Sequence, residues 1–80
     1  MKTIILSHSA AKSLDRLPDD TRARIGEAMV TYATAGIGDS KAMTGTPTVR
    51  LRIGDFRVIF DETATSIHIL ALGNRREIYR

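Results

Sequence analysis

The stretch that most constrains the fold is Val49–Phe60, in which two short runs of apolar and basic residues flank a Gly-Asp pair. Such a pair is typical of a two-residue hairpin turn, because glycine accepts the positive φ that these turns need. We therefore predict a β-hairpin in which Arg52 lies directly opposite Arg57. Because side chains alternate across a strand, Arg50, Arg52 and Arg57 share one face. The other face is apolar and consists of Val49, Leu51, Ile53, Phe56, Val58 and Phe60.

The arginine face of this hairpin predicts a binding surface for an anion. Opposed side chains have Cβ atoms about 5 Å apart, where like charges destabilise a sheet. In water that repulsion amounts to about 1 kcal/mol, which a bound polyanion would relieve. The net charge of +3 is compatible with a nucleic acid or an acidic protein as partner. From Arg50 onward every basic residue is arginine, whose planar fork suits phosphate.

Before the hairpin, the sequence predicts a short apolar segment and a first helix. Thr3–Leu6 is an apolar run that suits a strand or a buried segment. Ser7 or Ser9 offers an N-cap to the helix that follows. Pro18 ends this helix, because it has no N–H to donate and restricts the residue before it.

A second helix is expected between Asp19 or Asp20, as its N-cap, and Gly36. Its apolar residues recur at the spacing of one helical face, namely Ile25, Ala28, Met29, Tyr32 and Ala33. The polar, glycine-containing stretch Gly36–Thr48 is expected to be a loop that could serve in binding.

After the hairpin, Asp61–Ser66 is expected to form a turn and Ile67–Leu72 a third strand, and Gly73-Asn74 releases the chain from the sheet. Two helices on one face of a small sheet is the natural arrangement for such a pattern. We therefore predict an α+β fold: two N-terminal helices packed on one face of a mostly antiparallel sheet of about four strands. The arginine face then points away from the helices.

Length and composition predict one domain spanning residues 1–80, as expected for a chain of this size. The absence of cysteine excludes disulfides, a thiolate nucleophile and Cys-based zinc sites. His8 and His68 lie far apart in the sequence and are expected to be structural, so neither a metal nor a cofactor is expected. No apolar run suits a signal peptide or a membrane span, and the cytoplasm is the expected location.

The residues able to carry chemistry are arginines and tyrosine. No Ser/His/Asp arrangement, phosphate loop or metal-ligand spacing is visible. Arginines bind a phosphate and the charge that develops on it, and a tyrosine can transfer a proton. RNA brings its own nucleophile, the 2′-hydroxyl, so that a protein with these groups need only position and stabilise it.

Val49–Phe60, followed after an apolar strand by Gly-Asn-Arg-Arg-Glu-Ile-Tyr-Arg at the end of the chain, resembles the RelE/ParE toxin superfamily of type II toxin–antitoxin systems. Ala10–Pro18 is similar to the first helix of the family and its proline break. The Arg…Tyr ending is closer to the RelE branch than to ParE. That resemblance implies metal-independent cleavage of mRNA in the ribosomal A site, by attack of the 2′-hydroxyl on the adjacent phosphate. It also implies a cognate antitoxin that wraps and inhibits the toxin in a hetero-oligomer.

The resemblance assigns roles to individual residues. Arg57 matches a phosphate-binding arginine, and Arg75 an arginine that stabilises the transition state or protonates the leaving group. Tyr79 matches a tyrosine that transfers a proton or stacks on a base. Arg50 and Arg52 stand where the best-known member has lysines. Because arginine hardly deprotonates, they are expected to bind the RNA backbone rather than to act as a base.

Arg76 and Lys41 complete the expected set of RNA-binding residues. Two other functions stay open for the same chain. One is that of a ParE-like inhibitor of DNA gyrase, which acts by binding. The other is that of a catalytically inactive module, whose basic face only docks an acidic segment of an antitoxin.

Overall fold

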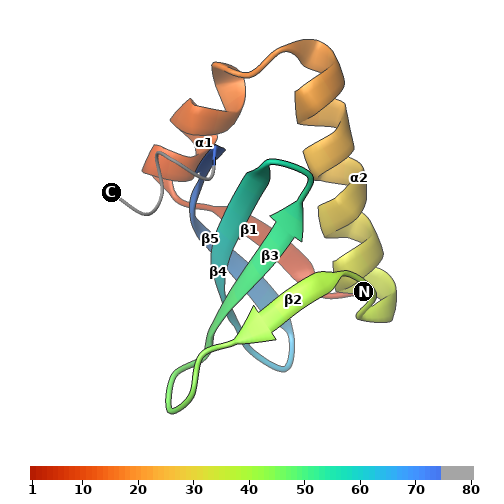
Figure 1. The fold of residues 1–80 in the computed structure, drawn as a ribbon. Coiled ribbons are helices and arrows are strands. Elements are labelled where there is room, and N and C mark those ends of the chain that lie inside the picture. The colour runs from red at the N-terminus through yellow and green to blue at the C-terminus, as the bar shows by residue number, and fades with distance from the viewer. Residues whose placement is uncertain (75–80) are drawn as a thin grey trace.

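Two helices lie on one side of a five-stranded sheet (Figure 1). The computed structural model describes residues 1–74 of the 80. The elements follow one another as β1 (Thr3–Leu6), α1 (His8–Asp15), α2 (Asp19–Ala35), β2 (Asp39–Ala42), β3 (Thr48–Ile53), β4 (Phe56–Glu62) and β5 (Ser66–Asn74). In space the strands are ordered β1-β5-β4-β3-β2. The predicted α+β class is confirmed.

The helix termini differ in part from the prediction. Ser7 caps α1, its side chain accepting a hydrogen bond from the N–H of Ala10. The helix ends at Asp15 rather than running on to Pro18, since a proline disfavours helical conformation in the residue before it. Pro18 is itself the N-cap of α2, whereas Asp19 and Asp20 lie in the first turn. Their negative charges there interact favourably with the positive end of the helix dipole.

The sheet has one strand more than predicted. We expected Gly36–Thr48 to be a loop, but Asp39–Ala42 pairs antiparallel with β3 and forms the edge strand β2. All four of its residues are exposed, so no alternation of apolar and polar residues reveals it. The prediction of about four strands is therefore one strand short. The mostly antiparallel character holds, because within residues 1–74 only β1 pairs in parallel, with β5.

The strands β4 and β5 are longer than predicted. Pairing between them continues to Glu62 in β4 and begins at Ser66 in β5, so the turn is shorter than Asp61–Ser66. Gly73 and Asn74 do not release the chain but pair with Arg57 and Phe56. Both residues extend the sheet because β4 offers them a partner strand.

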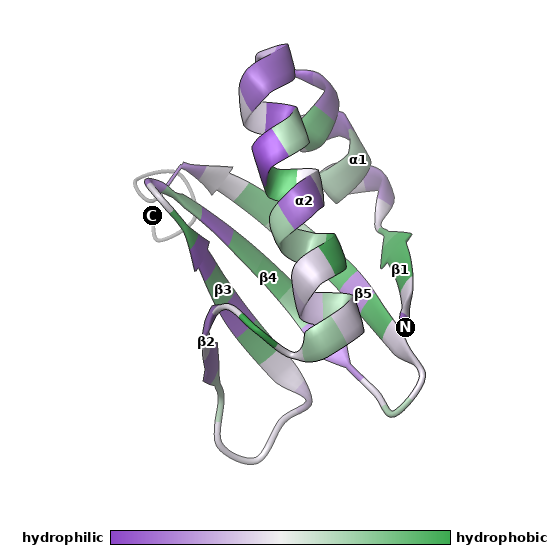
Figure 2. Ribbon diagram, turned by 90° about the vertical axis from the view of Figure 1, so that its right-hand side faces the viewer, coloured by the Kyte–Doolittle hydropathy of each residue, from purple (hydrophilic) through white to green (hydrophobic). Residues whose placement is uncertain are grey.

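The core lies between the helices and one face of the sheet. Its helical part is Ile25, Met29 and Ala33 of α2 with Ala10 of α1, as the predicted apolar face of α2 requires. From the sheet come the buried residues Val49, Leu51, Ile53, Val58, Phe60, Ile67, Ile69 and Leu72. Figure 2 shows purple and green bands alternating along β3, with the helices on one side of the sheet. Within residues 1–74, no element covers the opposite side, which we call the open face.

Candidate functional site

The β3–β4 hairpin places the arginines on the open face. Its turn contains Gly54 with a φ of 60°, as the sequence predicts. The predicted register is confirmed, with Arg52 opposite Arg57 and Arg50 opposite Ile59. Between these residues, Leu51 and Val58 point the other way and are buried against the helices. Burial of the alternate residues therefore fixes which face the arginines take.

Arg52 and Arg57 form the centre of the site. Arg52 is exposed and Arg57 is half-buried. The Nη1 atom of Arg57 donates to the carbonyl of Phe56 at 3.2 Å, which leaves most of its donors available. Within residues 1–74, neither guanidinium has a carboxylate partner. Two opposed guanidiniums on an open surface, neither of them in a salt bridge within residues 1–74, favour binding of a phosphate.

The edge strand β2 widens this surface. Lys41 pairs with Arg50 and therefore lies on the same face, although it was expected on a loop. Asp39 pairs with Arg52 and brings a negative charge to the margin of the arginine face. The sequence did not predict Asp39 as part of the site, because nothing in its neighbourhood indicates a strand.

Across the sheet, Gly73 is the β5 neighbour of Arg57. Gly73 is buried and has no side chain, so no β5 side chain stands beside the half-buried guanidinium in this row. A Gly-Asn pair after an apolar run is a typical turn signal, so the sequence did not predict that Gly73 pairs with Arg57 in the sheet. The cross-strand row is thus Asp39, Arg52, Arg57 and Gly73.

Three of the predicted site residues, Arg75, Arg76 and Tyr79, lie outside the described residues. The last described residue, Asn74, pairs with Phe56, so β5 ends beside the hairpin turn. Arg50, Arg52, Arg57 and Lys41 are brought together on one face as the hairpin and β2 require.

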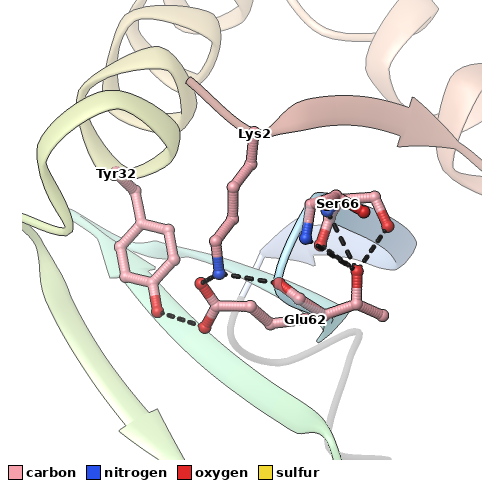
Figure 3. Close-up of polar contacts among 6 residues, drawn as sticks. Lys2, Tyr32, Glu62 and Ser66 are labelled. Carbon is pink, nitrogen blue, oxygen red and sulfur yellow. Dashed lines mark hydrogen bonds and ion pairs between the residues drawn. The ribbon is translucent and has the colours of Figure 1, made fainter.

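A second polar cluster lies on the helix side, at the opposite end of β4 (Figure 3). Lys2 Nζ contacts Glu62 Oε2 at 2.7 Å, and the Tyr32 hydroxyl donates to Glu62 Oε1 at 2.8 Å. The bond from Lys2 lowers the pKa of Glu62 below its ordinary value, and burial and Glu62 raise the pKa of Tyr32. The ring of Tyr32 also meets Phe60 edge-on, with centroids 5.2 Å apart. This cluster joins the residue before β1 to α2 and β4 and serves stability.

Two further features of the described residues bear on function. No helix in residues 1–74 is long and apolar enough to span a membrane. In the same part of the chain, no three His, Cys, Asp or Glu residues are grouped so that they could hold a metal ion.

Comparison with known proteins places this fold. Residues 4–79 match the family described as the ParE toxin of type II toxin–antitoxin systems, parDE. The archaeal RelE–RelB complex from Pyrococcus horikoshii OT3 is 25% identical, with a TM-score of 0.79 over 92% of this chain and 94% of that chain. The RelB–RelE antitoxin–toxin complex from Methanococcus jannaschii is 20% identical, with a TM-score of 0.76 over 94% of each chain.

YafQ from E. coli strain BL21(DE3) is 11% identical, with a TM-score of 0.71 over the whole of both chains, and likewise shares the fold. Among curated proteins, none matches this sequence. The family match covers nearly the whole chain and confirms the superfamily that the sequence motifs suggested. This chain belongs to the ParE toxin family of type II toxin–antitoxin systems, within the RelE/ParE superfamily.

Proposed function

We propose that this toxin is a ribosome-dependent endoribonuclease that cleaves mRNA in the ribosomal A site. The 2′-hydroxyl of one nucleotide attacks the adjacent phosphate, and the protein supplies positioning, charge and proton transfer without a metal. A cognate antitoxin neutralises it in a hetero-oligomer in the cytoplasm.

The observation that carries this proposal is the opposed pair Arg52 and Arg57 on the open face. Their repulsion is relieved when a phosphate lies between them, so the face is arranged to take a polyanion. Lys41 and Arg50 pair with one another in the neighbouring row and extend the basic surface. A single strand of RNA running along β3 and β4 would place consecutive phosphates on these two rows.

The residue roles follow from the chemistry of each group. Arg57 binds the scissile phosphate, and Arg52 holds the RNA backbone opposite it. Arg75 stabilises the charge of the transition state, and Tyr79 transfers the proton. These last two assignments rest on the resemblance of the sequence, as does the assignment of Arg76 to RNA contact.

The antitoxin partner is supported by the relatives. The structures from M. jannaschii and P. horikoshii are complexes of a toxin with its antitoxin. A basic face on this chain suits an acidic segment of such a partner.

One observation favours a second function, inhibition of DNA gyrase. The family that matches the sequence is named for ParE, whereas the structural relatives include RelE toxins. Gyrase inhibition acts by binding, and would leave mRNA intact while inducing a DNA-damage response.

The deciding experiment is expression of the chain without its antitoxin, with mRNA 5′ ends mapped by primer extension. The proposal expects new cuts within translated regions. In the Arg57→Ala variant we expect the cuts to fall by about a hundredfold, the size typical of losing a charge-stabilising donor.

Arg16→Ala is the matched control, because Arg16 is exposed at the end of α1, in the helical layer. It removes the same charge and should leave the cuts unchanged. Growth arrest with intact mRNA and DNA damage would replace the nuclease with gyrase inhibition. The absence of any phenotype would leave a module that binds only its antitoxin.

A further inference from the structure

A second group of side chains lies on the open face, about 13 Å along β4 from the row of Arg57, as four residues of a strand span. Asp61 of β4 pairs with His68 of β5, and His68 pairs in turn with Ile5 of β1. Thr48 of β3 pairs with Asp61 from the other side. Because paired residues point to the same face, all four side chains lie in one row on the open face.

A contact with Ser66, two residues earlier on β5, orients the imidazole of His68. Its Nε2 atom lies 3.1 Å from Ser66 Oγ, within hydrogen-bonding distance. Ser66 Oγ in turn lies 2.8 Å from Thr63 Oγ1, which accepts from the N–H of Ser66 and thereby fixes the β4–β5 turn. Figure 3 shows the contacts of Ser66 with this turn, without the ring of His68. The exposed ring is therefore oriented by the turn rather than free to rotate.

Apolar side chains flank the ring. Ile5 is 44% exposed and Leu70 is 42% exposed. Leu70 lies two residues beyond His68 on β5, at a bulge where Ile69 pairs with Phe60 and Ala71 with Ile59, so Leu70 has no partner on β4. An exposed flat ring between two exposed apolar side chains is suited to stacking with a nucleobase.

Beside the ring, Asp61 offers a carboxylate with unused acceptors. The Thr48 hydroxyl donates to Asp61 Oδ1 at 2.7 Å and so orients the group. Within residues 1–74, Oδ2 receives no hydrogen bond. A carboxylate accepts and does not donate. A base beside it must therefore present donors, and guanine presents two adjacent donors, N1–H and N2–H, on its Watson–Crick edge.

We infer that Asp61 and His68 form a subsite for one unstacked guanine, in an RNA strand whose phosphates lie on the arginine rows. His68 stacks on the base, Ile5 and Leu70 exclude water around it, and Asp61 accepts from its Watson–Crick edge. This inference rests on the proposed RNA target. It adds a position of base preference a few nucleotides from the phosphate at Arg57.

The test uses the purified full chain and 2′-O-methyl RNA hexamers, which cannot be cleaved by 2′-hydroxyl attack. Each hexamer carries one guanine in a uridine background, and a matched series carries inosine, which lacks only the N2 amine. Fluorescence anisotropy gives the affinities. We expect guanine to bind about tenfold more tightly than inosine at one position of the hexamer, the size of one base-edge contact.

Asp61→Asn should abolish this preference, because the amide replaces one acceptor by a donor while its oxygen still accepts from Thr48. His68→Ala should weaken binding of every hexamer about tenfold, the size of one lost stacking contact. The matched control His8→Ala lies at the start of α1 and should change neither quantity. Circular dichroism of each variant checks that it is folded.

Equal affinity for guanine and inosine, or a preference that survives in Asp61→Asn, would overturn the subsite. So would an effect of these variants on binding of the antitoxin with none on RNA, which would assign the patch to a protein partner. The proposed nuclease is judged separately, by the mapped cuts and the Arg57→Ala variant. The subsite can therefore fail while the nuclease stands.

Discussion

Arg24 of α2 lies against Gly54 in the turn of the β3–β4 hairpin. A Cβ atom added to Gly54 would come 2.9 Å from Arg24 Nη2 and 3.1 Å from Nη1. The turn that sets the register of the arginine face is thus also a contact point between the sheet and the helical layer. The positive φ of Gly54, 60°, is a conformation that other residues adopt only with strain.

Gly54→Ala should lower the free energy of unfolding by about 1–2 kcal/mol, the cost of a left-handed conformation for a residue with a Cβ. The clash itself should add little, because the guanidinium is the end of a flexible side chain. Gly45→Ala separates the two effects, since Gly45 has a φ of 78° and open space around its added Cβ. Urea unfolding should give both variants similar losses. A much larger loss of stability for Gly54→Ala would mean that the side chain of Arg24 cannot move away from the added Cβ.

Arg52 and Arg57 should repel one another measurably when no anion is bound. A double-mutant cycle of Arg52→Gln and Arg57→Gln isolates this pairwise free energy from the loss of each side chain's other contacts. We expect a repulsive coupling of about 0.2–1 kcal/mol at low salt, typical of directly opposed like charges. Because Arg52 is exposed, the coupling should shrink at about 1 M salt, where charges are screened within about 3 Å. Attractive coupling would contradict the opposed geometry.

The Lys2–Glu62–Tyr32 cluster predicts a loss of stability in acid. Because the pKa of Glu62 is lower in the folded protein than its ordinary 4.5, the stabilisation is complete above pH 4.5 and is lost as the pH falls through the folded-state pKa. Glu62→Gln should lose about 1 kcal/mol at neutral pH, the net value of such hydrogen bonds, and should lose less than the wild type on acidification.

Urea unfolding at neutral and acidic pH measures this, with Asp55→Asn, an exposed carboxylate of the hairpin turn, as control. The raised pKa of Tyr32 predicts a loss of stability in alkali. Above pH 10.0 the tyrosine ionises in the unfolded chain before it ionises in the folded protein, so the free energy of unfolding falls. Tyr32→Phe should remove that alkaline loss. An unchanged acid dependence in Glu62→Gln would show that the cluster does not couple stability to pH.

The hairpin could be predicted residue by residue because two independent signals agree there. The Gly-Asp pair fixes the turn, and the alternation of apolar residues with arginines over Val49–Ile53 and Phe56–Val58 fixes the faces. The apolar face of α2 was predictable for the same reason, since the spacing of Ile25, Met29 and Ala33 matches one helical face.

The strand β2 was not predictable, because Asp39–Ala42 has no buried residue and contains types that are depleted in strands. Only its pairing with β3 makes it a strand. That pairing adds Asp39 to the site and places Lys41 on a strand rather than on the expected loop. Gly73 was concealed in the same way, because its place in the sheet depends on β4. The roles of Arg75, Arg76 and Tyr79 stay predictions.

Asp39 should weaken the affinity of the arginine face for RNA. It pairs with Arg52, so its carboxylate lies at the margin of the surface on which phosphates would bind. At a separation of about 10 Å in water, one removed repulsion corresponds to about 0.4 kcal/mol, and to more where solvent is excluded. We therefore expect Asp39→Asn to bind single-stranded 2′-O-methyl RNA about two- to fivefold more tightly at low salt.

The control for Asp39→Asn is Asp20→Asn, which makes the same change of charge in the first turn of α2, in the helical layer. Anisotropy titrations across a series of salt concentrations distinguish local from global effects. A local effect appears in Asp39→Asn alone and fades as salt rises, because screening shortens the reach of the carboxylate. If both variants gained affinity equally, net charge would account for the gain. Asp39 would then not belong to the site, because a charge on β2 beside Arg52 would have no local effect on the affinity for RNA.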